Sequence, residues 1–287
     1  MRSHPCLRRA ASLLIGCWLA VFAAEPVALH ACPVHDGPHS ASQQTHHSQH
    51  APEHHSCTCP GACCPTVGVH LESTPALAPA RVVAFVEPEG CLITRFVEGE
   101  TGRVTIAEAA SLLRRLHGGR PIPGRFDALH VVDEYAASAQ ARGAQLPRRF
   151  AQARELGSAI AARLGRRPLA PCHNDLLAAN FISDAVRTWI VDWEYAGMGD
   201  PAFDLANFAV SNGLDAEGDR ALLAAYGSEE ADVHVLQRYL SDFREAMWGV
   251  LQQAISTLDF DFAAYADEHF DRLEQTAAEP RFRCLVD

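Results

Sequence analysis

The fold of this chain is decided by two neighbouring stretches, CHNDLLAANFI at residues 172–182 and WIVDWEY at residues 189–195. Asp175 follows His173 by two positions, and Asn180 comes five positions later. A short apolar run then leads into a second acidic pair, Asp192 and Glu194. Phosphoryl transfer needs one carboxylate to accept a hydroxyl proton, and an amide oxygen and a second carboxylate to hold Mg²⁺. The spacing therefore predicts a phosphoryl-transfer site.

The same motifs resemble those of a known family. The order HNDL-x3-N, then VDWEYAG at residues 191–197 and FDLAN at residues 203–207, is similar to the choline/ethanolamine kinase branch of the aminoglycoside-phosphotransferase-like kinases. The similarity runs from about Arg81 to near the C-terminus. It implies an α+β, protein-kinase-like fold with a mostly helical C-lobe. It also implies ATP- and Mg²⁺-dependent phosphorylation of the hydroxyl of choline, ethanolamine or a similar amino alcohol.

Five residues receive roles in this interpretation. Asp175 is the expected catalytic base, and Asn180 and Asp192 are the expected Mg²⁺ ligands. The resemblance implies that His173 and Asp204 support the catalytic loop through hydrogen bonds and take no part in the chemistry. For the two ligands and the base, the alternative is an ordinary turn or loop-capping role.

A quaternary ammonium group has no hydrogen-bond donor, so aromatic faces and nearby negative charge must recognise it. Trp248 falls where choline kinases carry an aromatic cage residue, with core packing as its alternative role. Tyr195 and Glu194 are further substrate-binding candidates. The sequence departs from the family at Leu251, where a second cage tryptophan is expected, and at Ser211, where an acidic substrate contact is expected. A weaker cage leaves ethanolamine or another amino alcohol as open as choline.

Strands are predicted at Arg81–Val86 and Cys91–Phe96, on either side of the turn EPEG. The resemblance makes this hairpin the last part of an N-lobe sheet, and it implies that Phe96 and Glu98 contact the adenine of ATP. No segment before the hairpin has the pattern of a strand followed by a glycine-rich loop, a second strand and a helix. The chain also contains no lysine to bind the phosphates. The resemblance therefore implies an incomplete N-lobe and poor or absent turnover.

Helices are predicted after the hairpin. Thr105 is expected to cap a helix over Ile106–Leu116, with Glu108 completing a capping box. Apolar residues spaced by three and four, together with cap signals, predict five further helices. They cover Ala128–Arg142, Arg148–Leu164, Pro201–Ser211, a long helix that Ser228 caps and that runs to about Leu258, and Phe262–Leu273.

The N-terminal quarter has a different composition. Residues 1–28 have the arginines and the apolar run of a secretion signal, and the run is too short for a membrane span. Residues 29–80 form a His/Cys-rich low-complexity segment and a linker, which we expect to be disordered. Eight of the 15 histidines lie between His30 and His55. This composition favours weak Zn²⁺ or copper binding, and the alternative is a tail without a physiological metal.

Residues 81–287 remain as an incomplete phosphotransferase domain. A net charge of -11 argues against nucleic acid as a partner and against an anionic membrane surface. No transmembrane span is expected beyond the signal-like segment, and the oligomeric state is not predicted. ATP chemistry implies the cytoplasm, whereas the signal-like segment suggests export. Two explanations stay open, a fused or misassembled reading frame and a non-catalytic exported metal-binding protein that carries a vestigial kinase lobe.

Overall fold

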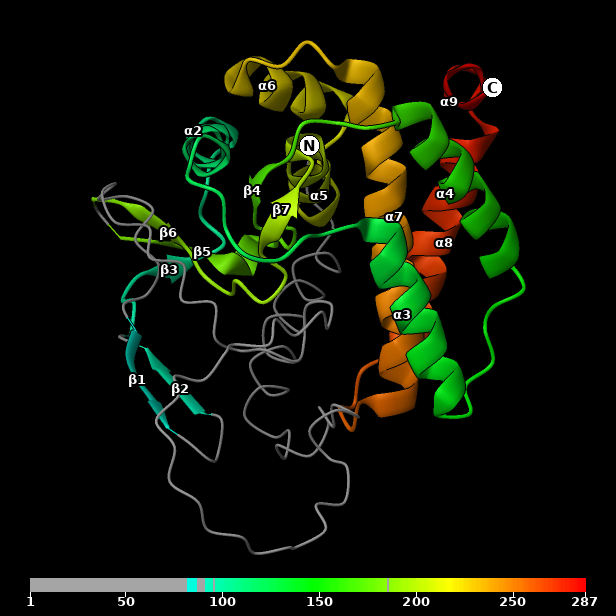
Figure 1. Ribbon diagram of the computed structural model, residues 1–287, viewed down its shortest axis with the longest axis horizontal. Helices are drawn as coiled ribbons and strands as arrows, with labels where there is room; N and C mark the ends of the chain where they lie inside the picture. The colour runs from blue at the N-terminus through cyan, green and yellow to red at the C-terminus, as the bar shows by residue number, and fades with distance from the viewer. Residues whose placement is uncertain (1–81, 87–90, 95, 185) are drawn as a thin grey trace, which may run out of the picture.

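The structure is a computed structural model that describes residues 82–86, 91–94, 96–184 and 186–287 (Figure 1). The predicted signal-like segment and the predicted His/Cys-rich segment lie outside these residues, and so does the expected Zn²⁺ or copper binding. Among the described helices, none combines the length and the apolar character that crossing a bilayer requires.

The predicted hairpin is present. Strands β1 (Val82–Val86) and β2 (Cys91–Thr94) pair antiparallel, with an irregularity in register between Val82 and Ala84. The chain continues into β3 (Glu100–Thr101), which belongs to a different small sheet. Figure 1 shows the hairpin at one end of the molecule, next to this second sheet.

The second sheet has the order β3-β5-β6 and is antiparallel throughout, with β5 at Phe181–Ser183 and β6 at Thr188–Ile190. Gly99 comes close to β5, since a Cβ atom at this position would lie 2.7 Å from the carbonyl oxygen of Ser183. Any larger residue would push the two strands apart. Because β5 starts directly after Asn180, this sheet fixes one end of the predicted Mg²⁺-binding loop.

A third sheet fixes the other end of that loop. Strands β4 (Ala170–Cys172) and β7 (Gly197–Gly199) pair antiparallel, with Cys172 opposite Gly197. Residues 173–180, hereafter the catalytic loop, connect β4 to β5 and finish in the short 3-10 turn η2 (Ala178–Asn180). The loop is therefore anchored at both ends by short antiparallel ladders.

Most predicted helices occur with small shifts at their ends. Thr105 caps α2 (Ile106–His117), and both hydrogen bonds of the predicted capping box with Glu108 are formed. The other predicted helices correspond to α3 (Ala128–Ala141), α4 (Phe150–Leu164), α5 (Pro201–Ser211), α7 (Ala231–Ile255) and α8 (Phe262–Ala278). The mostly helical architecture predicted from the sequence is thus confirmed.

Two details of the helix prediction were wrong. Ser228 does not cap α7, because the helix starts three residues later and the Ser228 hydroxyl accepts a hydrogen bond from the backbone of Glu230 instead. Helices α6 (Ala216–Tyr226) and α9 (Pro280–Val286) were not predicted. Few large apolar residues mark α6, although Asp215 caps its start and the left-handed Gly227 ends it.

The helices build two apolar cores on either side of the catalytic loop. One core joins α3, α4, α7, α8 and α9, with Phe243 and Met247 of α7 fully buried at its centre. The other joins α2, α5 and α6 with Leu176 and Phe181 from the loop region. Helix α7 packs against both α3 and α8, and Figure 1 shows β4 and β7 between α2 and α5. Helix α5 contributes to both cores and is buried from Ala202 to Val210.

We expect Thr105→Ala to destabilise the protein by about 1 kcal/mol, because the cap of α2 and the bond back to Glu108 are lost together. This free energy corresponds to a fall in Tm of roughly 2–4 °C for a domain of this size. Thermal unfolding followed by circular dichroism measures the change. Thr257→Ala is the control, because Thr257 is exposed, and a Tm as low for this variant as for Thr105→Ala would contradict the prediction.

Candidate active site

Helix α5 holds the catalytic loop through the carboxylate of Asp204. One oxygen of this carboxylate accepts the backbone N–H of His173 at 2.8 Å, and the other accepts the N–H of Asn174 at 2.6 Å. The first oxygen also lies 3.0 Å from Nε2 of His117. Asp204 is fully buried in the first turn of α5, where the positive end of the helix dipole favours a negative charge.

Two amides at the same helix continue this support. The side-chain oxygen of Asn207 accepts the N–H of Leu176 at 2.6 Å, and its Nδ2 donates to the hydroxyl of Ser241. Nδ2 of Asn212 donates to the carbonyl of Leu176 at 3.0 Å. Helix α5 therefore binds the loop on both sides of Asp175, the predicted base.

His173 connects the catalytic loop to the residue before Asp192. Its Nε2 lies 2.9 Å from the carbonyl of Val191, which only accepts, so Nε2 carries the hydrogen. The other ring nitrogen then accepts the backbone N–H of Asp175 at 3.2 Å. Burial lowers the pKa of His173, although nearby carboxylates oppose this effect. A neutral imidazole with both nitrogens engaged is suited to bracing the loop and not to taking up protons.

The backbone turns sharply on both sides of this brace. Asn174 has φ of 67° and Asp192 has φ of 66°, in the left-handed region that asparagine and aspartate tolerate best after glycine. Asn174 is held there because its Nδ2 donates to the carbonyl of Tyr195 at 2.9 Å. Asp175 therefore follows a bend at Asn174 that a side-chain hydrogen bond stabilises, and Asp192 lies at a bend itself.

Asp175, Asn180 and Asp192 are brought into one site. Nδ2 of Asn180 donates to the backbone carbonyl of Asp175 at 2.8 Å and lies 3.5 Å from Oδ2 of its carboxylate. Asp175 is close enough to Asp192 for its negative charge to raise the pKa of the Asp192 carboxyl. Burial raises the pKa of Asp175, although Arg244 opposes this effect.

Asp192 has the features of a cation ligand. Its Oδ2 is buried and has no hydrogen-bond partner among the described residues. Burial, together with the smaller effects of the charges of Glu194 and Asp175, raises the pKa of its carboxyl to about 8. Because Nδ2 of Asn180 is committed to Asp175, its side-chain oxygen is the atom left to bind a metal. Carboxylate and amide oxygens of this kind fit Mg²⁺.

Trp248 belongs to a group of four aromatic side chains at the end of α7 and the start of α8. Its ring lies 5.7 Å from that of Phe262 and 5.5 Å from that of Tyr265, and Phe260 contacts both of these rings. We call Trp248, Phe260, Phe262 and Tyr265 the aromatic cluster. Trp248 is half-buried, so packing within the cluster leaves part of the indole accessible.

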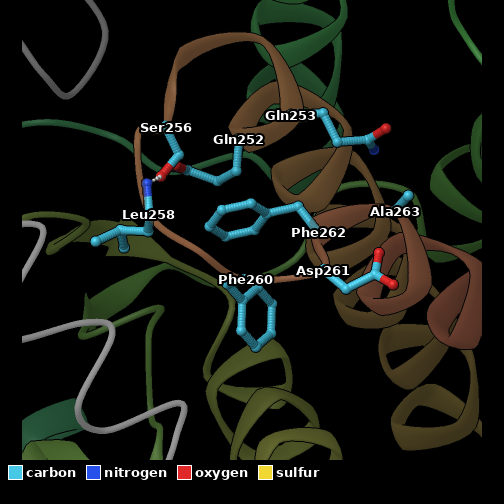
Figure 2. A pocket seen from close by; sticks show the side chains of 8 residues that line it. All are labelled: Gln252, Gln253, Ser256, Leu258, Phe260, Asp261, Phe262 and Ala263. Carbon is cyan, nitrogen blue, oxygen red and sulfur yellow. Dashed lines mark hydrogen bonds between the residues drawn. The ribbon is translucent and has the colours of Figure 1, made fainter.

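A pocket of about 300 Å³ opens beside the aromatic cluster. Figure 2 shows the ring of Phe262 among the residues that line it, with the backbone of Leu258 hydrogen-bonded to the hydroxyl of Ser256 across the turn. Gln252, Gln253 and Asp261 supply polar groups. Asp175, Asn180 and Asp192 do not line this pocket, so it is separate from the acidic site. It shares Phe260 and Phe262 with the aromatic cluster.

The other predicted site residues lie in different surroundings. Tyr195 is half-buried, its hydroxyl lies 2.5 Å from that of Tyr135, and Arg244 lies over its ring. Glu194 is exposed. Phe96 is 84 % exposed, and it lies with the exposed Glu98 between β2 and β3. The pairing of β3 with β5 connects this segment to the end of the catalytic loop.

A group of possible metal donors also surrounds Asp204. Donor atoms of His117, Cys172 and Asp204 lie within 4.8 Å of one another. Both ring nitrogens of His117 are already hydrogen-bonded, one to Asp204 and one to Tyr226. Burial raises the pKa of the Cys172 thiol far above its usual range, which disfavours the thiolate. These contacts make the group part of the loop support.

Comparison with known proteins identifies the group to which this site belongs. The family model described as "Phosphotransferase enzyme family" matches residues 64–239, which include the catalytic loop and most of the helices around it. This match is more than half of the chain. The chain belongs to the phosphotransferase enzyme family.

Curated relatives of this chain include a LicA homologue and an ethanolamine kinase. A "Protein LicA homolog" from Metamycoplasma hominis is 34 % identical over 111 residues, which are 38 % of this chain and 43 % of the relative. Human "Ethanolamine kinase 2" is 31 % identical over 137 residues, 37 % of this chain and 34 % of the relative. The alignments therefore span less than half the length of these curated relatives.

A solved structure extends the likeness over more of the chain. The choline/ethanolamine kinase family protein from Mesorhizobium loti has a TM-score of 0.63 and 30 % identity, over 72 % of this chain and 77 % of the other. Choline kinase LicA from Streptococcus pneumoniae has a TM-score of 0.60 with 21 % identity, which supports the fold alone. The phosphotransferase is thus choline/ethanolamine-kinase-like, as its motifs predicted.

The sequence analysis missed several polar residues of this phosphotransferase. Asn207 and Asn212 bind the loop backbone, and Arg244 contacts Asp175 directly. Asn207 lies three residues after Asp204, and this helical spacing on an otherwise apolar helix was the available signal. No comparable signal marked Arg244, because its partners lie about 70 residues earlier in the chain.

Asp204→Asn is expected to lower the free energy of unfolding by about 3 kcal/mol, because the amide turns an NH₂ group towards backbone donors in a buried site. Urea unfolding followed by fluorescence measures this. Asp215→Asn is the matched control. Its carboxylate also accepts two backbone N–H groups, and asparagine caps a helix as well as aspartate, so a change within about 0.5 kcal/mol is expected. Equal effects in the two variants would contradict the prediction.

The raised pKa of Asp192 predicts a pH-dependent stability of the metal-free protein. Folding favours the protonated carboxyl, so its stabilising contribution is full below about pH 4 and is lost as the pH rises towards 8. Asp192→Asn removes this loss of stability at higher pH, because the amide does not ionise. In EDTA we expect the variant to exceed the wild-type Tm by a margin that grows by roughly 4 °C or more between pH 5 and pH 8.

Asp184→Asn is the control for this measurement. Asp184 is exposed, and backbone hydrogen bonds lower the pKa of its carboxyl, so its Tm difference from wild type should stay constant over the same interval. A margin for Asp192→Asn that does not depend on pH would show that Asp192 is ionised in the folded protein at pH 5.

Proposed function

We propose that this protein is an ATP- and Mg²⁺-dependent small-molecule phosphotransferase, and that it phosphorylates the hydroxyl of choline, ethanolamine or a similar amino alcohol. The observation that carries the proposal is the buried Oδ2 of Asp192, which has no hydrogen-bond partner in the described ranges and lies in the same site as Asp175 and Asn180. This site combines a base candidate with two oxygen ligands, as phosphoryl transfer requires.

Asp175 is the proposed general base. Its carboxylate takes the proton from the alcohol while the alcohol oxygen forms a bond to the γ-phosphorus of ATP, and the bond from that phosphorus to the β,γ-bridging oxygen breaks. Asn180 and Asp192 would hold Mg²⁺, which neutralises charge on the phosphates when it is bound. His173 keeps Asp175 at a fixed place relative to Asp192, because its ring bonds the backbone on both sides.

The aromatic cluster is the proposed recognition site for the substrate ammonium. Ring faces attract a cation, and desolvation strengthens the attraction. Trp248 is the ring proposed to contact the ammonium group directly. Glu194 is proposed to add negative charge, and Tyr195 is proposed as a further contact. Leu251 and Ser211 lack the aromatic and acidic groups expected of a choline cage, so we propose that primary and quaternary amines compete on similar terms.

Phe96 and Glu98 are the proposed contacts for the adenine. A related LicA structure is described in complex with AMP, at 20 % identity and a TM-score of 0.60. The sequence contains no lysine, so the usual lysine contact to the phosphates is not available, and we expect slow turnover. The use of ATP favours a cytoplasmic location for the phosphotransferase domain.

The proposal predicts slow ATP turnover by the full-length protein in the presence of Mg²⁺ and an amino alcohol. Phosphate transfer to choline, ethanolamine and an aminoglycoside is compared by ³¹P NMR of the products. Asp175→Asn should lower turnover by about 10²-fold or more, since general-base catalysis contributes 10²–10⁴-fold. Asp184→Asn, an exposed turn residue, should leave it unchanged.

A binding measurement complements this assay. Asp192→Ala should abolish Mg²⁺-dependent binding of a non-hydrolysable ATP analogue in calorimetry, whereas Asp184→Asn should bind like wild type. Turnover that is equal in wild type and Asp175→Asn would overturn the role of Asp175. Mg²⁺-dependent nucleotide binding that survives Asp192→Ala would overturn the metal site.

A further inference from the structure

Arg244 is a buried cation that contacts the catalytic loop at two points. It lies on α7 and is 3 % exposed. One guanidinium nitrogen donates to the backbone carbonyl of Asn174 at 2.6 Å, and another donates to Oδ1 of Asp175 at 2.7 Å. The side chain therefore binds both the carboxylate of Asp175 and the backbone that carries it.

Arg244 is itself held by residues on the substrate side of the site. The nitrogen that contacts Asp175 also donates to Oε1 of Glu245 at 2.5 Å, and the guanidinium lies 5.2 Å from the ring centre of Tyr195. The other oxygen of Glu245 accepts the hydroxyl of Tyr265 at 2.8 Å. Since Tyr265 belongs to the aromatic cluster, a continuous series of contacts joins that cluster to Asp175.

These contacts distinguish the two oxygens of Asp175. Oδ1 is occupied by Arg244. Oδ2 has a contact of 3.5 Å with Nδ2 of Asn180, and the same Nδ2 already makes a shorter bond of 2.8 Å to the backbone carbonyl. Oδ2 is thus the oxygen with its lone pairs least engaged, and it is the one suited to accept a proton.

We propose that Arg244 is the positioning residue for Asp175. It holds the carboxylate by Oδ1, so that Oδ2 faces the alcohol. Glu245 and Tyr265 connect Arg244 to the aromatic cluster and so relate the position of Asp175 to that of the cluster. This inference rests on the proposed function, because it assigns Asp175 as the base. Arg244 acts through Asp175 and does not itself contact the reacting atoms.

The geometry requires arginine at this position. Three acceptors surround the guanidinium, namely the carbonyl of Asn174, Oδ1 of Asp175 and Oε1 of Glu245. A planar fork reaches them with two nitrogens, one for the carbonyl and one for both carboxylates, whereas the ammonium of lysine is a single point on a flexible stem. Lysine would preserve the charge and lose part of the orientation.

The test compares Arg244→Ala and Arg244→Lys with Arg238→Ala and Arg238→Lys in the full-length protein. Arg238 lies on the same helix, but it pairs with Asp219 of α6 and not with Asp175. Steady-state turnover is measured with and without added guanidinium chloride at low concentration, and the KM for ATP is measured in parallel. Guanidinium is the probe because it fits the space that Arg244→Ala creates.

We expect kcat to fall by roughly 10–100-fold in Arg244→Ala and less in Arg244→Lys, as for other outer residues that orient a catalytic group. The KM for ATP should stay within about twofold, and guanidinium should restore part of kcat in the alanine variant only. The Arg238 variants should keep wild-type kcat. A kcat within twofold of wild type in both Arg244 variants would overturn the proposal, and so would a loss in Arg244→Lys matched by Arg238→Lys.

A second readout is independent of turnover. Hydrogen exchange is measured by mass spectrometry on the peptide that covers residues 172–180. Arg244→Lys should speed exchange in this peptide and leave peptides from α2 and α6 unchanged, because only the local support is weakened. If wild type shows no turnover, the proposed function fails while this local change still supports the positioning role. Unchanged exchange in this peptide would overturn the role of Arg244.

Discussion

The structure of the site depends on one buried carboxylate, that of Asp204. It accepts backbone hydrogen bonds from His173 and Asn174 and a further bond from His117. Two consecutive N–H groups can point at one side chain only if the backbone between them turns, and Asn174 takes up this turn in the left-handed region. Without the carboxylate these donors would be buried and unsatisfied, at a cost of about 1–3 kcal/mol each. The position of Asp175, directly after the turn, follows from this constraint.

The electrostatics of the site favour added positive charge. Four carboxylates lie along it, those of Asp175, Asp192, Glu194 and Glu245, and the guanidinium of Arg244 bridges two of them. Within the part of the chain that the structure describes, Asp192 receives no such partner at Oδ2. A buried carboxylate is costly unless a cation compensates it. The excess of negative charge therefore suits the two cations that the proposed reaction brings, Mg²⁺ and an ammonium group.

The sequence predicted the parts of this molecule that depend on local pattern. The capping box at Thr105 and the proline-initiated helix from Pro201 were correct because their hydrogen bonds join neighbours in the chain. Asp175, Asn180 and Asp192 were found together because one motif carries all three. Arg244 was not predicted because α7 is buried on most of its surface. Its sequence therefore has no separate polar face, and no spacing of polar residues indicates which side chain points to the catalytic loop. Helix α6 was missed because only Leu222 and Leu223 are buried along it.

The proposed metal and the catalytic loop are coupled through the charge of Asp192. Without a cation, burial and the neighbouring carboxylates favour the protonated form, with a pKa of about 8. Binding of a divalent cation requires the ionised form, so binding releases a proton and strengthens as the pH rises towards that value. His173 links the residue before Asp192 to the backbone of Asp175. A change in charge at Asp192 therefore acts on a segment that is hydrogen-bonded to the proposed base, so the proposed metal and the proposed base belong to one cooperative unit.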